Sequence, residues 1–186
     1  NIQREFFKGF TQRMAFRYNT FSPAYNFGYY DPTKGDSSSN FQTSELILEA
    51  RFARDEVFLQ NETERLSLGT TKWPIIILKY TRGFKGISGS DFNYNKINLS
   101  FNQHIRWGAL GAADLLVSGE YIFEALPYPL LANHLGNQTP IYSSVTYNLM
   151  NFGEFVSDSY LSFQYRHNFE GLFLNRVPLL RKLKWR

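Results

Sequence analysis

Residues 96–107 alternate between apolar and polar side chains with a period of two. One parity is apolar apart from Gln103 and holds Ile97, Leu99, Phe101, Ile105 and Trp107. The other parity is polar throughout and holds Lys96, Asn98, Ser100, Asn102, His104 and Arg106. Successive side chains of a strand point to opposite faces, whereas a helix would scatter these residues around its axis. The pattern therefore predicts a β-strand with one apolar face and one polar face.

Five further stretches repeat this rhythm, so the predicted strands are 10–19, 43–54, 73–81, 96–107, 113–123 and 160–170. Most are about as long as a tilted transmembrane strand, which needs roughly 9–11 residues. Their polar faces carry charges that would be costly in a dry protein core. We therefore predict an all-β fold: an antiparallel up-and-down meander that is part of a transmembrane outer-membrane β-barrel. Lipid would lie against the apolar faces and water against the polar ones.

Long and short connections mostly alternate between these strands, as such a meander requires. Long loops are predicted over 21–40 and 124–158, and within the second we expect 142–150 to pair briefly or fold into the lumen. A glycine-rich loop is predicted over 82–92. The polar stretch 55–72 is long for an inner, periplasmic connection, so we expect part of it to extend the flanking strands.

The composition excludes several classes of protein. The chain has no cysteine, so it has no disulfide and no cysteine-based metal or nucleophile site. Its net charge of +4 is dispersed and too mild for a nucleic-acid interface. The longest purely aliphatic run, 75–78, is far shorter than the roughly 18 residues that a spanning helix needs. The short aliphatic run does not exclude a membrane-spanning β-strand, because only half of the residues of a barrel strand are apolar.

Six strands cannot close a bacterial barrel, which has at least about eight. The chain also ends on Arg186, whereas outer-membrane barrels usually finish on a strand with an aromatic last residue. We therefore expect 1–186 to be one partial barrel domain that continues beyond 186. The basic residues near this end could meet anionic headgroups or remain solvated: Arg176, Arg181, Lys182, Lys184 and Arg186.

The polar faces supply the candidate functional residues. The predicted lumen-lining side chains are Arg13, Arg17, Glu49, Arg51, Lys96, His104, Arg106, Asp114, Glu120 and Arg166, with Glu45 beside them. One interpretation is a charged surface that gives selectivity or docks a plug. The other is a salt-bridge network that fills a narrow barrel, in which Glu49 pairs with Arg13 or Arg17. The sequence leaves both open.

A catalytic interpretation is also available on the same face. Ser100, Asn102 and His104 are the residue types of a hydrolytic site on a barrel wall. The same types are ordinary lumen lining, so we predict no catalytic residue. No pair of histidines or carboxylates has the spacing of metal ligands, and no glycine-rich stretch has a phosphate-binding lysine. We accordingly predict neither a metal nor a cofactor.

Several longer motifs carry a resemblance to a known family: TRGFKG at 81–86, GSDFNY at 89–94, PYPLL at 127–131, NLMNF at 148–152, EFVSD at 154–158 and FLNRVPLLRKLKWR at 173–186. Together they resemble an outer-membrane β-barrel family of Bacteroidota that is of unknown function. Its members carry an N-terminal carboxypeptidase-regulatory-like domain, a small β-sandwich. The resemblance covers 73–186 well and the first 70 residues loosely. It implies an outer-membrane barrel and supplies no substrate or catalytic residue.

Arg82, Gly83 and Phe84 also resemble the Arg-Gly-aromatic loop of barrel-assembly and translocation pores. In those pores the loop folds back into the lumen and its arginine docks on the barrel wall. The resemblance implies a lumen-docked loop at 82–84. The alternative is an extracellular turn with a solvated arginine.

Three functions follow from these patterns. The first is a barrel segment of the bacterial outer membrane with a transport, receptor or assembly role. Its partners would be outer-membrane lipid and periplasmic or outer-membrane proteins, not nucleic acid. The second is a soluble β-sandwich or barrel that acts as a binding module, in which the apolar face of 96–107 packs on another sheet. The third is a barrel-borne enzyme.

Overall fold

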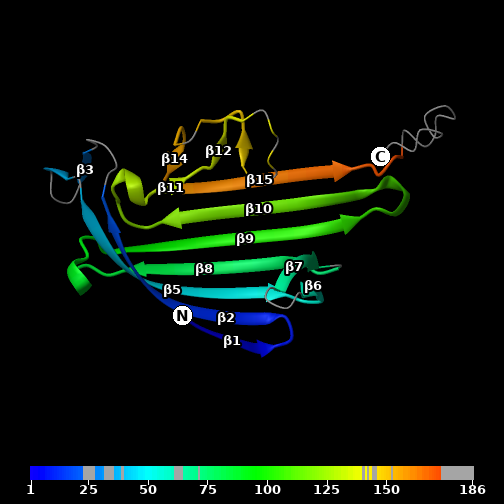
Figure 1. Cartoon of the computed structure of the whole chain (residues 1–186), viewed down its shortest axis with the longest axis horizontal. Helices are drawn as coiled ribbons and strands as arrows, with labels where there is room; N and C mark the ends of the chain where they lie inside the picture. The colour runs from blue at the N-terminus through cyan, green and yellow to red at the C-terminus, as the bar shows by residue number, and fades with distance from the viewer. Residues whose placement is uncertain are drawn as a thin grey trace.

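A seven-stranded antiparallel sheet dominates the fold (Figure 1). The computed structural model describes residues 1–22, 28–31, 36–38, 40–60, 65–70, 72–139, 141, 143, 146–151 and 153–172. In sheet order the strands are β1 (Ile2–Phe7), β2 (Phe10–Phe21), β5 (Phe41–Ala53), β8 (Ile75–Gly83), β9 (Tyr94–Arg106), β10 (Ala112–Ile122) and β15 (Ser159–Asn168). Each pairs only with its neighbours, so β1 and β15 are open edges in the described part of the chain. The all-β antiparallel meander is confirmed, and no closed barrel is seen in these residues.

All six predicted strands are present with ends shifted by a few residues, but β1 was missed. Arg4 interrupts its apolar parity and Phe6-Phe7 breaks the alternation, so the pattern gave no clear period. The turn into β2 depends on Gly9, whose φ is +84°. A Cβ there would lie 2.8 Å from the carbonyl oxygen of Ala53, so only glycine fits beside the end of β5.

The register aligns the apolar parities of all the strands on one face. Met14, Leu48, Tyr80, Ile97 and Tyr121 are successive cross-strand partners, although they come from five different strands. The side chains of this face are not covered by the described chain. Leu99 is 49%, Leu161 81% and Phe163 68% exposed. The alternation of apolar and polar residues in the sequence therefore corresponds to the two faces of the sheet.

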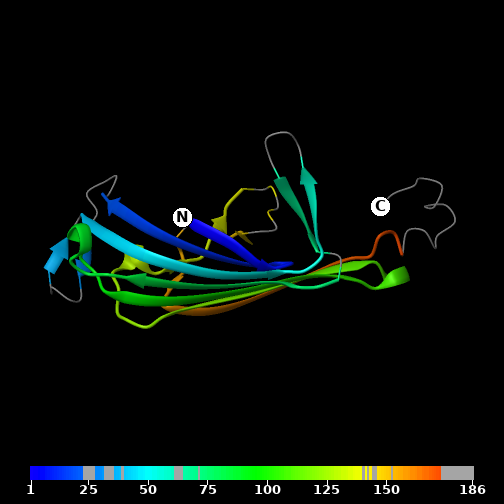
Figure 2. The same cartoon turned by 90° about the horizontal axis from the view of Figure 1, so that it is seen from below.

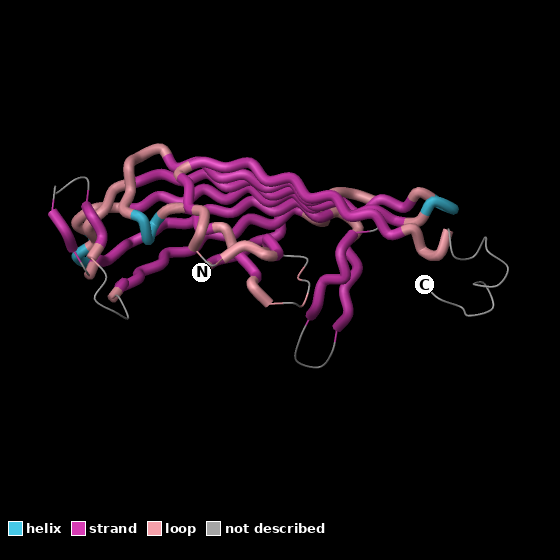
Figure 3. Tube along the Cα trace, turned by 90° about the horizontal axis from the view of Figure 1, so that it is seen from above, coloured by secondary structure: helices cyan, strands magenta, loops and turns pink. Residues whose placement is uncertain are grey.

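The sheet is curved, and two connections project from its polar side (Figures 2 and 3). One is the hairpin of β6 (Glu56–Gln60) and β7 (Arg65–Thr70), which is a separate two-stranded sheet. The expectation that 55–72 extends the flanking strands is therefore wrong, because these residues pair with each other. The other is the β10–β15 connection, which begins at 123 and ends at 158.

The β10–β15 connection is folded into short pairs rather than left as an open loop. Its elements are η3 (Tyr128–Leu130), β11 (Ala132–Asn133), β12 (Gly136–Asn137), β13 (Tyr147–Asn148) and β14 (Val156–Ser157), with β11 pairing with β14 and β12 with β13. The brief pairing expected within 142–150 is thus confirmed for β13.

The largest apolar cluster lies on the polar side, at one end of the sheet. Its buried members are Phe41, Phe92, Tyr94, Ile122, Leu126 and Leu130. Four strand or strand-end side chains meet two from the β10–β15 connection, which fixes that connection against the sheet. Among the described residues, this buried apolar cluster therefore forms where the β10–β15 connection meets the polar face, and none of its members lies on the apolar face.

The remaining elements are short. They are β3 (Tyr29–Asp31), β4 (Asp36–Ser38), η1 (Ile87–Gly89) and η2 (Gly108–Leu110), and β3 pairs with β4 inside the stretch predicted as a loop over 21–40. Among the described residues, no helix is long and apolar enough to cross a membrane. The basic residues predicted at 176–186 and the motif at 173–186 lie outside the described residues.

Candidate functional site

Charged side chains from four central strands and β2 meet on the concave, polar face. They surround a cavity of about 230 Å³. Its charged lining consists of Arg13, Arg17, Glu45, Glu49, Lys79, Lys96 and Glu120. The structure thus brings together five of the ten predicted lumen-lining residues, beside Glu45 and Lys79. Cations and carboxylates alternate across the strands, so opposite charges face one another.

The closest ion pair of this cavity joins Arg13 and Glu49, which are cross-strand partners on β2 and β5. An Arg13 Nη atom donates to Glu49 Oε2 at 2.6 Å. Both side chains are partly shielded from solvent, at 38% and 20% exposure. Of the two partners suggested for Glu49, the structure selects Arg13, because the register places Arg17 opposite Glu45 instead.

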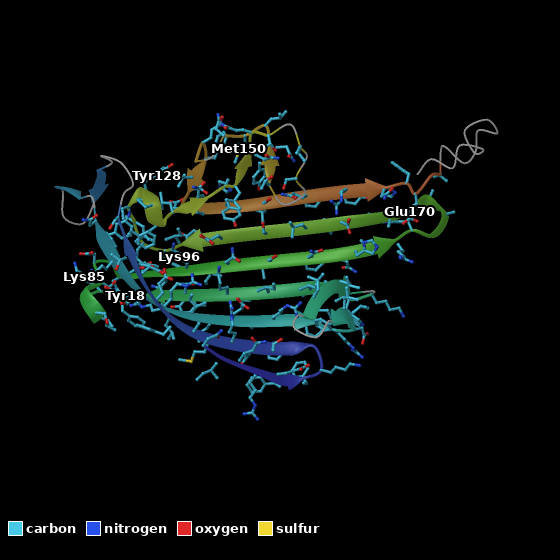
Figure 4. The ribbon with its side chains drawn as sticks, viewed as in Figure 1. Tyr18, Lys85, Lys96, Tyr128, Met150 and Glu170 are labelled. Carbon is cyan, nitrogen blue, oxygen red and sulfur yellow. The ribbon has the colours of Figure 1, made fainter. Side chains whose placement is uncertain are left out.

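Lys96 lies at the boundary between the cavity and the apolar cluster (Figure 4). Its ammonium donates to the carbonyl oxygen of Leu130 at 2.5 Å and stands 5.2 Å from the ring centroid of Tyr94. Tyr94 is fully buried, and its hydroxyl donates to Glu45 Oε1 at 2.5 Å. Lys96 therefore fastens the β10–β15 connection to the sheet, while Tyr94 holds Glu45 in place.

A second polar network crosses β9, β10 and β15 near the other end of the sheet. His104, Asp114 and Arg166 are consecutive cross-strand partners. His104 Nδ1 lies 2.7 Å from Asp114 Oδ1, and the Arg166 guanidinium donates to Asp114 Oδ2 through Nε at 3.2 Å and Nη2 at 2.7 Å. Both carboxylate oxygens are engaged, so the network holds three side chains together at one level of the sheet.

The last two predicted lumen residues have different surroundings. Arg51 forms a two-pronged ion pair with Glu56, at 2.6 Å and 2.8 Å, and so anchors the β6–β7 hairpin to the sheet. Arg106 ends β9 and is exposed beside the hairpin. All ten predicted residues lie on polar strand positions, but they do not form one continuous site: five line the charged cavity, three form the second network, and Arg51 and Arg106 lie near the hairpin.

The residue types that suggested hydrolysis are not assembled as a catalytic set. Ser100 and His104 are four residues apart on one strand, which separates their Cα atoms by roughly 13 Å. The described contacts of His104 are to Asp114, and no hydroxyl group bonds to it. No group of three or more metal-ligating side chains occurs within the described ranges.

The predicted loop at 82–84 is partly strand. Arg82 and Gly83 end β8, and Arg82 follows Leu78 and Tyr80 on the apolar parity, so its side chain starts from the face opposite to the charged cavity. Its guanidinium stands 5.9 Å from the ring centroid of Phe84. Glycine is needed at position 83 because a Cβ there would lie 2.3 Å from the Tyr94 ring.

Residues from the connections were missed by the sequence reasoning. The Glu124 carboxylate accepts hydrogen bonds from Asn95, both from its backbone N–H and from its side-chain amide, each at 2.6 Å. Tyr147 donates to Ser162 Oγ at 2.6 Å. The period of a strand carries no signal for such contacts, because loop side chains reach the sheet by tertiary folding.

The fold and this face define a class: an open antiparallel β-meander with a bare apolar convex face and a charged concave face. The family model described as "Family of unknown function (DUF5686) C-terminal domain" matches residues 3–186. The chain therefore belongs to this family. No curated protein and no solved structure matches it.

Proposed function

We propose that this chain is part of an outer-membrane β-barrel with a transport, receptor or assembly role that does not involve catalysis. The observation that carries the proposal is the inverted arrangement of the sheet. Leu99, Leu161 and Phe163 are exposed on the convex face, while Glu49 and Lys96 are partly shielded on the concave one. A lipid-facing wall with a wet interior has this arrangement.

The dimensions of the apolar face support the same proposal. Tyr80 and Tyr121 are at the level of Ile97, and Trp107 follows the end of β9. About ten residues separate these aromatic levels, or roughly 33 Å along the strand. At a tilt of about 40° this corresponds to a height of about 25 Å, which is the apolar band that outer-membrane barrels present between two aromatic girdles.

The remaining parts of the proposal follow from the sequence. The motifs quoted above favour the outer membrane of Bacteroidota as the location and an attached carboxypeptidase-regulatory-like domain. The proposed neighbours are outer-membrane lipid and envelope proteins. Open edges at β1 and β15 fit a partial barrel domain whose remaining strands would pair there.

Spin labels on β9 test the proposal in the full-length protein reconstituted in lipid bilayers. Residues 1–186 contain no cysteine, so Leu99→Cys and Ser100→Cys place single labels on adjacent, opposite positions once any cysteine elsewhere in the full-length protein has been replaced by serine. We expect oxygen to relax the label at 99 more strongly, and a water-soluble nickel chelate to relax the label at 100 more strongly. If both reagents fail to reach position 99, that side chain is packed under protein and the soluble-sandwich alternative is supported.

Heat-modifiable migration on a gel provides a second readout. A membrane barrel keeps a compact, detergent-resistant fold until it is boiled, and it requires detergent for extraction. Purification as a soluble monomer without detergent would contradict the proposal.

A further inference from the structure

Two cavities on the concave face share part of their floor. One, of about 580 Å³, is bounded by the β13 segment through Tyr147, and the other, of about 500 Å³, by the β6–β7 hairpin through Val57 and Leu68. Asn102 and Asp114 line both. The cavities therefore adjoin at these two residues, and together they define a trough that crosses β9, β10 and β15 between two walls. This trough is separate from the charged cavity around Arg13.

Two carboxamides form the middle of the trough floor. Asn102 and Gln164 are the cross-strand partners of Leu116 on its two sides. Two strand spacings place their Cα atoms roughly 10 Å apart. Neither side chain makes a hydrogen bond within the described part of the chain, so both retain donors and acceptors for a ligand. A ligand that reaches both must be extended.

An ion-paired network forms the next level of the floor. In the His104–Asp114–Arg166 network, the Asp114 carboxylate lies between the His104 ring and the Arg166 guanidinium. Apolar surface alternates with these polar groups, through Leu116 in the floor and the ring of Tyr147 in one wall. The Tyr147 ring is fixed by its hydroxyl contact to the sheet.

We propose that the trough binds a neutral, extended, polyhydroxylated ligand of the oligosaccharide class. A carboxamide offers a donor and an acceptor in one plane, and a sugar hydroxyl is likewise both donor and acceptor. The C–H faces of sugar rings would pack on Leu116 and Tyr147. An anionic ligand would pair with Arg106 at one end of the trough, and an added peptide strand would pair with the open edge of β15, so the test below includes a probe of each kind. The inference names the ligand class of the receptor or transport role proposed above, and rests on it.

The test measures binding by the full-length protein in a detergent without a sugar headgroup, using isothermal titration calorimetry. The neutral probes are the hexasaccharides of glucose, xylose and N-acetylglucosamine; the comparison probes are hexagalacturonate and hexaglycine. Asn102→Leu and Gln164→Met remove the floor amides at nearly constant volume. Gln12→Met makes the same change on the convex face of β2 and serves as the matched control.

We expect at least one neutral hexasaccharide to bind, and each floor variant to weaken that binding about tenfold, as loss of hydrogen bonds to an uncharged ligand does. Gln12→Met should bind as the unmodified protein does. The inference is overturned if no neutral probe binds at about 10 mM, if binding ignores both floor variants, or if hexagalacturonate or hexaglycine binds more tightly. Heat-modifiable migration of the same samples reports separately on the barrel, so loss of binding with intact migration rejects the ligand class alone.

Discussion

Leu99→Lys places a charge near the middle of β9, on the apolar face. The neighbours of Leu99 in the sheet are Leu78 and Gly119, and 49% of its own surface is exposed. Gly119 has no side chain, and the Leu161 side chain that reaches over it is itself 81% exposed, so the new ammonium would be shielded only in part. Whatever solvent covers the convex face will therefore determine the effect of the substitution.

The size of the change in the free energy of unfolding distinguishes a lipid environment from water. A lysine at the bilayer midplane of a barrel destabilises it by about 2–4 kcal/mol, and near the interface by about 0–1 kcal/mol. An exposed surface substitution in water usually changes the free energy of unfolding by less than about 0.5 kcal/mol. We therefore expect about 2–4 kcal/mol for Leu99→Lys and at most about 1 kcal/mol for Tyr121→Lys, which lies close to the strand end on the same face.

The assay is guanidinium unfolding of the full-length protein in lipid bilayers, followed by tryptophan fluorescence. Ser100→Lys is the matched control, because it adds the same charge one residue away on the polar face. Its expected effect is below about 1 kcal/mol, since lumen water solvates the ammonium. A cost at Leu99 no larger than that at Ser100 would refute the lipid-facing assignment. Equal, large costs at Leu99 and Tyr121 would instead indicate a buried protein interface, which has no dependence on membrane depth.

Three stability predictions concern positions where the geometry leaves little freedom, and all use the same titration. Gly111→Ala should lower the free energy of unfolding by more than about 2 kcal/mol, because φ is +97° and the new Cβ would lie 2.0 Å from a backbone oxygen of β15. Gly86→Ala is the control: φ is +83° but no atom lies within 4 Å of the new Cβ, so the loss should be only about 1–2 kcal/mol. Equal losses would show that the contact with β15 is unimportant. Gly83→Ala displaces the Tyr94 ring and should cost about 1–3 kcal/mol; a neutral result would mean that the ring relocates freely. Tyr94→Phe leaves Glu45 without its donor and should cost about 1–3 kcal/mol, and an unchanged midpoint would contradict that dependence.

The six predicted strands of the main sheet could be identified because each shows the alternation of apolar and polar residues within its own sequence. The parity of β9 is visible within twelve residues, and the register merely aligns it with the same parity in β8 and β10. One cross-strand pair, Arg13 with Glu49, was anticipated from charge alone. Periodicity therefore identified which side chains share a face, and with it the residues of the concave site.

The connections were not predictable in this way. The hairpin of β6 and β7 is stabilised by pairing within itself and by the Arg51–Glu56 ion pair, neither of which has a periodic signature. Likewise, Lys96 was assigned to the lumen by parity, but its partner is a carbonyl oxygen of the distant β10–β15 connection. Such contacts depend on the tertiary path of a loop, about which the alternation of a strand says nothing.

The placement of the connections bears on what surrounds this sheet. A sheet in water gains stability when loops or a second layer cover its apolar face, since each Å² of apolar surface removed from water contributes about 25 cal/mol. Here the hairpin and the β10–β15 connection both fold against the face that already carries Glu49, Lys96 and Asp114. The convex face, with Leu99 and Phe163 exposed, receives neither of them. Soluble monomers rarely expose contiguous apolar patches beyond a few hundred Å². A chain that folds two large connections onto its polar face leaves its apolar face without cover from itself, and the lipid contact that we propose would supply that cover over the height that β9 spans.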